Sequence, residues 1–135
     1  MSEILQYNER VLEHFKAPRN VGVIKEADGT GYAGDPSWGI DMELYLKIED
    51  GVIVEAKTRT FGCAATIAVT SVITEILKGK ALAEALLISE QDITGKLGGI
   101  PASKAHCAKL GVEMIKSAIE DFRQHRRGKN EIFRA

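Results

Sequence analysis

The residues of this chain best suited to chemistry are two cysteines and one histidine: Cys63, Cys107 and His106. Cys63 stands where an extended pattern gives way to a helical one, and Cys107 falls in the predicted first turn of a long helix. Backbone N–H groups and the helix dipole favour an anion at such positions. A cysteine there tends toward the thiolate, which is the form that binds metal or attacks sulfur. His106 would be a neighbouring ligand or a proton donor.

A purely structural interpretation of these cysteines stays open. Two cysteines far apart in a sequence are more often small buried core residues than parts of a site. The chain has no Cys-x-x-Cys or Cys-x-x-His pattern, so it lacks a self-contained zinc knuckle. It also lacks the glycine-rich phosphate-binding patterns and the Gly-x-Ser-x-Gly pattern of serine hydrolases. Glycines before the first strand and at 98–99 indicate turns, or loops that close over a shared site.

The elements that must position these residues begin with strands. Apolar residues alternate with polar ones over 41–49, which is the pattern of a half-buried strand. Asp50-Gly51 favours a tight hairpin turn, so we expect the partner strand over 52–60. A third strand is expected over 30–33.

Helical spacing dominates both ends of the chain. Apolar residues from Ile4 to Phe15 predict a first helix, with Ser2 as its cap and an end before Pro18. A second stripe runs over 65–77 and should stop near Gly79. A capping box at Ser89 predicts a short helix that ends before 98–99, and the long helix that carries Cys107 should begin at 101–103.

Length and composition favour one small domain. The chain has 135 residues, is 44% hydrophobic and 27% charged, and has a net charge of −1. Strands followed by helices predict a single α+β domain over 1–135, a small antiparallel sheet with helices packed on one face and a frayed tail over 127–135. The balanced charge argues against nucleic-acid binding. No apolar run is long enough for a membrane span and no signal peptide is evident, so we expect a cytoplasmic protein.

Three separated segments of the chain match motifs of one known protein family. The first is Tyr7-Asn8-Glu9 through His14-Phe15-Lys16-Ala17-Pro18-Arg19-Asn20-Val21-Gly22. The second is Thr60-Phe61-Gly62-Cys63-Ala64-Ala65, and the third is Gly98-Gly99-Ile100-Pro101-Ala102-Ser103-Lys104-Ala105-His106-Cys107. In this order, from about Tyr7 to Arg126, the segments resemble the IscU/NifU family of iron–sulfur cluster assembly scaffolds.

The resemblance implies a function. Scaffolds of this family take sulfur as a persulfide from a pyridoxal-phosphate cysteine desulfurase, combine it with iron, hold a [2Fe–2S] cluster and deliver it to acceptor apo-proteins. On this resemblance Cys63 takes the place of the second cysteine of the family and Cys107 the place of the third, which is the usual persulfide acceptor. His106 takes the histidine place and Lys104 the lysine place.

The resemblance also implies an incomplete cluster site. The first family motif, Ala-Cys-Gly-Asp, corresponds here to Ser37-Trp38-Gly39-Ile40, so Trp38 replaces a cysteine and Ile40 an aspartate. Both share the strand parity of Met42, which predicts that they extend the apolar face and that the Trp38 indole fills a dry pocket. Asp41 is a further candidate metal ligand but should point to the other face. Cys63, Cys107 and His106 therefore remain as the ligands for iron or a cluster, and zinc is less favoured for the same reason.

Four functions follow from these observations. The first is a cluster assembly scaffold with a modified metal site, in which two ligands per chain bridge a cluster across a homodimer. The second is a specialised sulfur carrier that keeps the desulfurase partner and holds no cluster. The third is an enzyme with Cys107 as nucleophile and His106 as acid–base partner, which we favour less. The fourth is a structural or regulatory relative with inert cysteines.

Overall fold

Alternating apolar side chains build a three-stranded antiparallel sheet, as the sequence predicts. A computed structural model describes residues 6–134, with side chains for residues 6–125. The strands are β1 (Gly29–Asp35), β2 (Ile40–Glu49) and β3 (Val52–Phe61), in the spatial order β1-β2-β3. Every second residue of β2, from Ile40 to Ile48, is buried. Asp50 and Gly51 join β2 to β3 with positive φ angles of 51° and 75°, which is the conformation of a type I′ turn.

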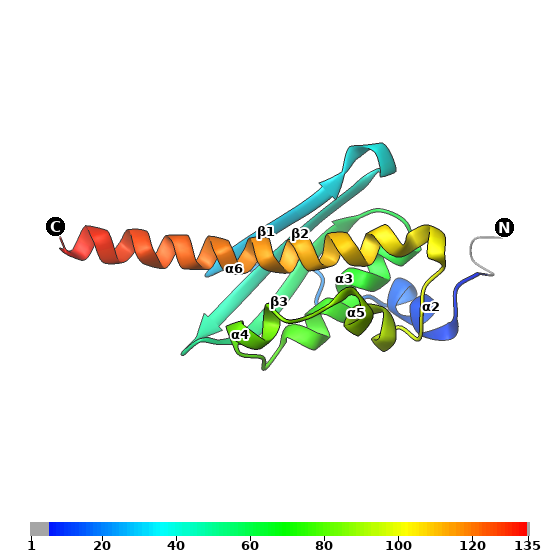
Figure 1. The fold of residues 1–135 in the computed structure, drawn as a ribbon, viewed down its shortest axis with the longest axis horizontal. Helices are drawn as coiled ribbons and strands as arrows, with labels where there is room; N and C mark the ends of the chain where they lie inside the picture. The colour runs from blue at the N-terminus through cyan, green and yellow to red at the C-terminus, as the bar shows by residue number, and fades with distance from the viewer. Residues whose placement is uncertain (1–5, 135) are drawn as a thin grey trace.

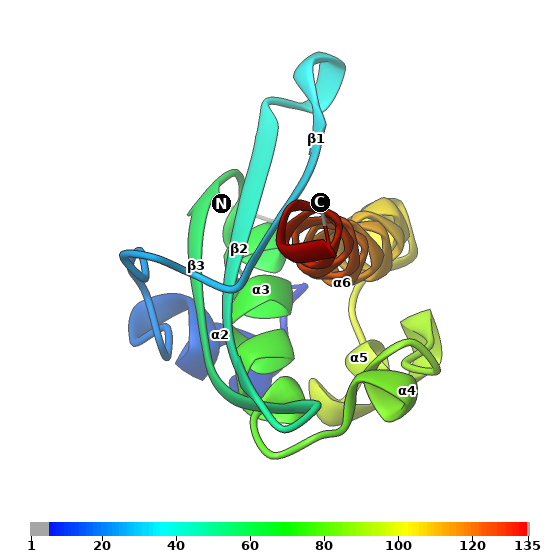
Figure 2. The same ribbon diagram turned by 90° about the vertical axis from the view of Figure 1, so that its left-hand side faces the viewer.

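Helices cover the buried face of this sheet. The two largest are α3 (Ala64–Leu77) and α6 (Ala105–Arg134), and Figure 2 shows both on the same side of the strands. α2 (Glu9–Lys16) packs against α3, and α5 (Glu90–Lys96) contacts both α3 and α6. The short helix α4 (Leu82–Ala85) and the single turns η1 (Pro36–Trp38) and η2 (Ala102–Lys104) complete the described elements. The predicted α+β class is therefore confirmed.

Hydrogen bonds from the backbone of β1 to side chains of α6 hold the helix against this edge strand. The N–H of Thr30 donates to Asp121 Oδ2 at 2.8 Å and that of Tyr32 to Ser117 Oγ at 3.1 Å, so helix side chains satisfy donors that an edge strand otherwise leaves free. A β carbon on Gly31 would lie 2.3 Å from the carbonyl oxygen of Met114, which explains why this position lacks a side chain. Figure 1 shows α6 running along β1.

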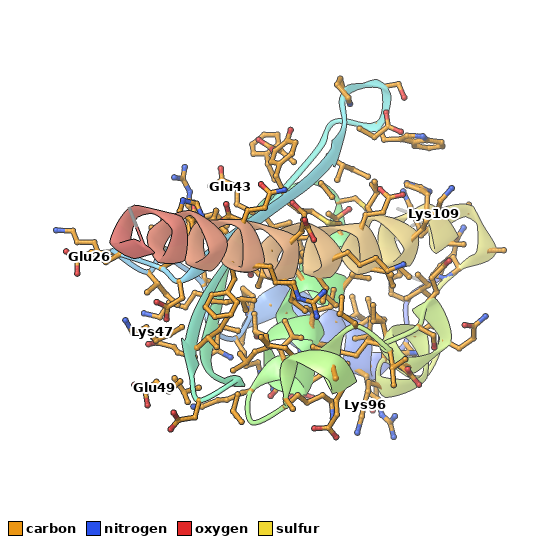
Figure 3. The ribbon with its side chains drawn as sticks, turned by 60° about the vertical axis from the view of Figure 1, so that its left-hand side comes forward. Glu26, Glu43, Lys47, Glu49, Lys96 and Lys109 are labelled. Atoms are coloured by element: carbon orange, nitrogen blue, oxygen red, sulfur yellow. The ribbon has the colours of Figure 1, made fainter. Side chains whose placement is uncertain are left out.

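The hairpin turn between β2 and β3 lies at one end of the molecule, and the start of α6 lies at the other. Figure 3 shows Lys47 and Glu49, beside the hairpin turn, at one end of the molecule and Lys109, near the start of α6, at the other. The latter end also holds the start of α3, so β3 delivers the chain directly to the region where α6 begins (Figure 1).

Several boundaries differ from those predicted. α2 begins at Glu9, because the Asn8 side chain accepts a hydrogen bond from the Val11 N–H at 2.9 Å and caps the helix. Ser2 and Ile4, predicted as its cap and first apolar residue, lie outside the described residues. The backbone of α6 is helical through Arg134, so fraying of the tail over 127–135 stays a prediction. No helix in the described part of the chain is long and apolar enough to cross a membrane.

Candidate functional site

The sulfur atoms of Cys63 and Cys107 share one hydroxyl group. Thr66 Oγ1 lies 3.3 Å from Cys63 Sγ and 3.4 Å from Cys107 Sγ. Cys63 is the N-cap residue of α3, and Cys107 lies in the first turn of α6, so both predicted helix-start positions are confirmed. The chain thus brings two thiols that are far apart in sequence to the same end of the molecule.

Local packing explains why Thr66 reaches both sulfurs. A β carbon on Gly62 would lie 2.8 Å from Thr66 Cβ, so the glycine permits the end of β3 to approach the first turn of α3. Thr66 is itself fully buried. Thr66 was not among the predicted site residues. Its signal is the spacing of three residues from the Cys63 cap, which places two side chains on neighbouring positions of a first helical turn.

Hydrogen bonding and burial shift the pKa values of the two thiols in opposite directions. A hydrogen bond from the Cys107 thiol, assisted by the Thr66 hydroxyl and the charge of Lys104, holds the pKa of Cys63 well below its usual value, although burial opposes this shift. The same hydrogen bond, together with burial, raises the pKa of Cys107. Cys63 is half-buried and Cys107 is fully buried. In this conformation the neighbouring Cys63 and burial oppose a thiolate on Cys107 by raising its pKa, and Cys107 as the persulfide acceptor stays a prediction.

His106 faces an aromatic partner rather than a sulfur. Its imidazole stacks on the Trp38 indole, with ring centroids 4.3 Å apart and an interplanar angle of 27°. Within the described residues no hydrogen bond joins His106 to Cys107, so helical neighbours in sequence do not become partners in space.

Trp38 and Ile40 differ in burial, although strand parity predicts that both lie on the apolar face. Ile40 is buried as predicted, with 4% of its surface exposed, whereas Trp38 is 58% exposed. The prediction for Trp38 is wrong because η1 and the left-handed Gly39, with φ 66°, interrupt the strand between β1 and β2. The indole therefore covers His106 from outside and fills no dry pocket.

Asp41 pairs with Phe61 in the sheet and lies on the face opposite the buried side chains of β2. It is exposed on β2, and its carboxylate accepts a hydrogen bond from the Tyr32 phenol, whose pKa is raised by that bond. Among the described residues, no three His, Cys, Asp or Glu side chains are grouped closely enough to hold one metal ion. The site thus presents a pair of thiols, with His106 and Asp41 engaged elsewhere.

Comparisons with known proteins agree with this fold. Residues 6–129 match the model of the NifU-like N terminal domain, so the chain belongs to this family. A protein of Aquifex aeolicus named iron-sulfur cluster assembly scaffold protein IscU is 45% identical over 119 residues, which cover 87% of this chain and 76% of that protein. The protein of the same name from Haemophilus influenzae is 42% identical over 123 residues, covering 88% and 97% of the two chains.

A solved structure shows the same fold at much lower sequence identity. The N-terminal part of a nitrogen-fixing NifU-like protein from Brucella abortus superposes with a TM-score of 0.73, over 88% of this chain and 95% of that one, at 19% identity. At this identity the similarity establishes the arrangement of helices and strands alone.

Proposed function

We propose that this chain acts in iron–sulfur cluster assembly and accepts sulfur, as a persulfide, from a cysteine desulfurase at the Cys63–Cys107 pair. One observation carries the proposal: both sulfurs contact the same Thr66 hydroxyl at the starts of two helices. The two relatives named as IscU scaffold proteins support a scaffold role, because their similarity extends over most of this chain. The acceptors of the sulfur or cluster would be apo-proteins.

Burial favours Cys63 as the first sulfur to meet a donor. The resemblance to the family assigns the persulfide to Cys107, but this residue has no exposed surface. Cys63 is half-buried and carries the lowered pKa, so it offers the reachable thiolate. Acceptance at Cys107 requires that the start of α6 first moves away from α3.

The cluster itself, as cargo, needs more ligands than one chain brings together. A [2Fe–2S] cluster usually has four protein ligands, and the thiol pair supplies two of them. We propose that a second copy of the chain supplies the other pair in a homodimer. His106 becomes available as a ligand only if its ring leaves the stack with Trp38.

The enzyme hypothesis has less support. It needs His106 as the acid–base partner of Cys107, and the His106 ring instead stacks on Trp38. No observation on the described residues favours it over sulfur acceptance.

Sulfur transfer tests the proposal directly. The chain is incubated without oxygen with a pyridoxal-phosphate cysteine desulfurase and cysteine, and the mass of the intact chain is then measured. We expect one added sulfur atom on the Cys107→Ser variant, located at Cys63, and none on the variant that lacks both cysteines. Labelling of Cys63→Ser alone would reassign the acceptor to Cys107. Absence of added sulfur from both single variants would contradict the proposed function.

A further inference from the structure

The two thiols contact the same hydroxyl group, which makes them candidates to react with each other. Thr66 Oγ1 lies 3.3 Å from Cys63 Sγ and 3.4 Å from Cys107 Sγ. A disulfide requires the two sulfurs to approach to about 2.05 Å. Among the described residues, no third His, Cys, Asp or Glu is grouped with them closely enough to hold one metal ion.

We propose that this pair releases the accepted sulfur as sulfide: Cys107 attacks a persulfide on Cys63, and a Cys63–Cys107 disulfide forms. The inference rests on the proposed sulfur acceptance and adds to it the chemical form in which sulfur leaves. Sulfide is the oxidation state of the bridging sulfur in an iron–sulfur cluster, so the step would supply cluster assembly with usable sulfur.

The step balances without an outside oxidant. The persulfide Cys63–S–SH and the thiol Cys107–SH give Cys63–S–S–Cys107 and hydrogen sulfide. The bond between the two persulfide sulfurs breaks and the bond between the two cysteine sulfurs forms. The outer sulfur is reduced and takes the electron pair of the broken bond, the Cys107 sulfur is oxidised, and the Cys63 sulfur keeps its oxidation state. The Cys107 proton leaves with the hydrogen sulfide.

Burial selects which sulfur is attacked. A donor reaches Cys63 from its exposed side, so the outer sulfur of the persulfide is added on that side. Cys107 has no exposed surface and approaches Cys63 from within the protein. It therefore meets the inner sulfur, and attack there expels the outer sulfur toward the surface. Attack on the outer sulfur would instead move the persulfide to Cys107.

Thr66 is a positioning residue for this step. Its hydroxyl contacts both sulfurs and is buried, so it can accept the Cys107 proton while it donates its own toward the Cys63 side. The contact between Gly62 and Thr66 fixes the hydroxyl between the two thiols.

The resulting disulfide must be reduced before the next cycle. A dithiol reductant would restore both thiols by thiol–disulfide exchange. Because metal binding needs thiolates, a chain that has just released sulfide cannot ligate iron until it is reduced. Sulfide release and cluster holding would then alternate at one pair of residues.

Glutathione persulfide tests the inference without a desulfurase. One equivalent is added without oxygen to the full chain and to Cys107→Ser, Cys63→Ser and the double variant. Free sulfide, free thiols and intact mass are measured after small molecules are removed. We expect the unaltered chain to release one sulfide per chain, to lose both thiols and to carry no added sulfur. Cys107→Ser should retain one added sulfur and release no more sulfide than the double variant.

The outcomes separate this inference from the function beneath it. If the unaltered chain keeps the added sulfur, with the Cys63 persulfide and the Cys107 thiol both intact, sulfide release is overturned and sulfur acceptance still stands. Absence of added sulfur and of sulfide in every variant would contradict both. Thr66→Val keeps the shape of the side chain and removes its hydroxyl. The double variant Cys107→Ser/Thr66→Val should accept one sulfur normally. The single variant Thr66→Val, in which Cys107 is present, should release sulfide several-fold more slowly than the unaltered chain. Thr66→Ser should restore the rate, and equal rates in Thr66→Val and the unaltered chain would remove Thr66 from the step.

Discussion

The Trp38 indole lies over the His106 imidazole, with ring centroids 4.3 Å apart, and so joins the β1–β2 connection to the first turn of α6. This contact stands beside the thiol pair, since His106 directly precedes Cys107. Trp38 is 58% exposed and makes this contact from η1, outside the packed core. The residue can therefore be changed without disturbing the fold.

Trp38→Cys should strengthen zinc binding, because it adds a thiolate next to His106 and close to the start of α6. The matched control is Trp38→Ser, which removes the indole and supplies a much weaker ligand. Competition against a coloured chelator, on proteins prepared without oxygen, measures the affinity. Equal affinities in the two variants would show that position 38 cannot reach the metal held by the thiols.

Ile40→Asp should unfold much of the protein rather than repair a ligand set. Ile40 is 4% exposed within the core, and a carboxylate there would have no partner. We expect a loss of about 3 kcal/mol or more in the free energy of unfolding, against about 1 kcal/mol for Ile40→Val. Urea denaturation measures both. A stable Ile40→Asp protein with raised metal affinity would instead mean that the carboxylate swings out to the site.

The pKa of Cys63 should depend most on Cys107. Cys107→Ala removes the largest cause of its lowering and should raise it most, whereas Cys107→Ser keeps a hydroxyl donor and should raise it less. Thr66→Val should have a smaller effect than Cys107→Ala. The rate of alkylation of Cys63 as a function of pH gives the value in each variant. An unchanged profile in Cys107→Ala would contradict the hydrogen bond between the two thiols.

Stability should fall in mild acid because of His14. This residue is buried between α2 and α3, its Nδ1 lies 2.7 Å from Ser71 Oγ, and burial holds its pKa below the ordinary value. Below about pH 6.5 the unfolded chain therefore binds more protons than the folded one, so the contribution is complete above that pH and is lost as the pH falls toward the folded pKa. His14→Gln should remove this part of the pH dependence. Urea midpoints at several pH values test it, and identical slopes in both proteins would contradict the assignment.

The contact between β1 and α6 should not tolerate a methyl group. Gly31→Ala would place a carbon 2.3 Å from a backbone oxygen, so either the strand or the helix must move. We expect a loss of about 2 kcal/mol or more in the free energy of unfolding. Gly95→Ala is the matched control, since nothing lies within 4 Å of its added carbon and the helix α5 should gain up to about 1 kcal/mol. Similar stabilities for the two variants would contradict the close packing.

Local sequence signals predicted most of the fold. The alternation in β2, the Asp50-Gly51 turn and the capping box at Ser89 depend on residues that are near neighbours in sequence, and all three are present. The same is true of the cysteines as helix-start residues. Trp38 was misplaced because parity holds only within an unbroken strand, and η1 with Gly39 ends that strand before Ile40.

The missing parts of the site depend on contacts between distant segments. Thr66 belongs to the site because α6 places Cys107 in contact with it. No sequence pattern within α3 predicts that contact. The order of the two thiol pKa values follows first from the interaction between the two thiols and then from the burial of Cys107. Both depend on how α6 packs against α3 and the sheet. The helix N-terminus, His106 and Lys104 together favour a thiolate on Cys107, and none of these sequence signals indicates how deeply that residue is buried.

Cluster reconstitution is the most direct test of the claim that Cys63 and Cys107 act together as the sulfur site. The chain is incubated without oxygen with ferrous iron, a cysteine desulfurase, cysteine and a dithiol, and visible absorption, iron and acid-labile sulfide are measured after gel filtration. We predict a cluster on the unaltered chain, one for every two copies, and its loss in both Cys63→Ser and Cys107→Ser. An undiminished cluster on the variant that lacks both cysteines would contradict the account.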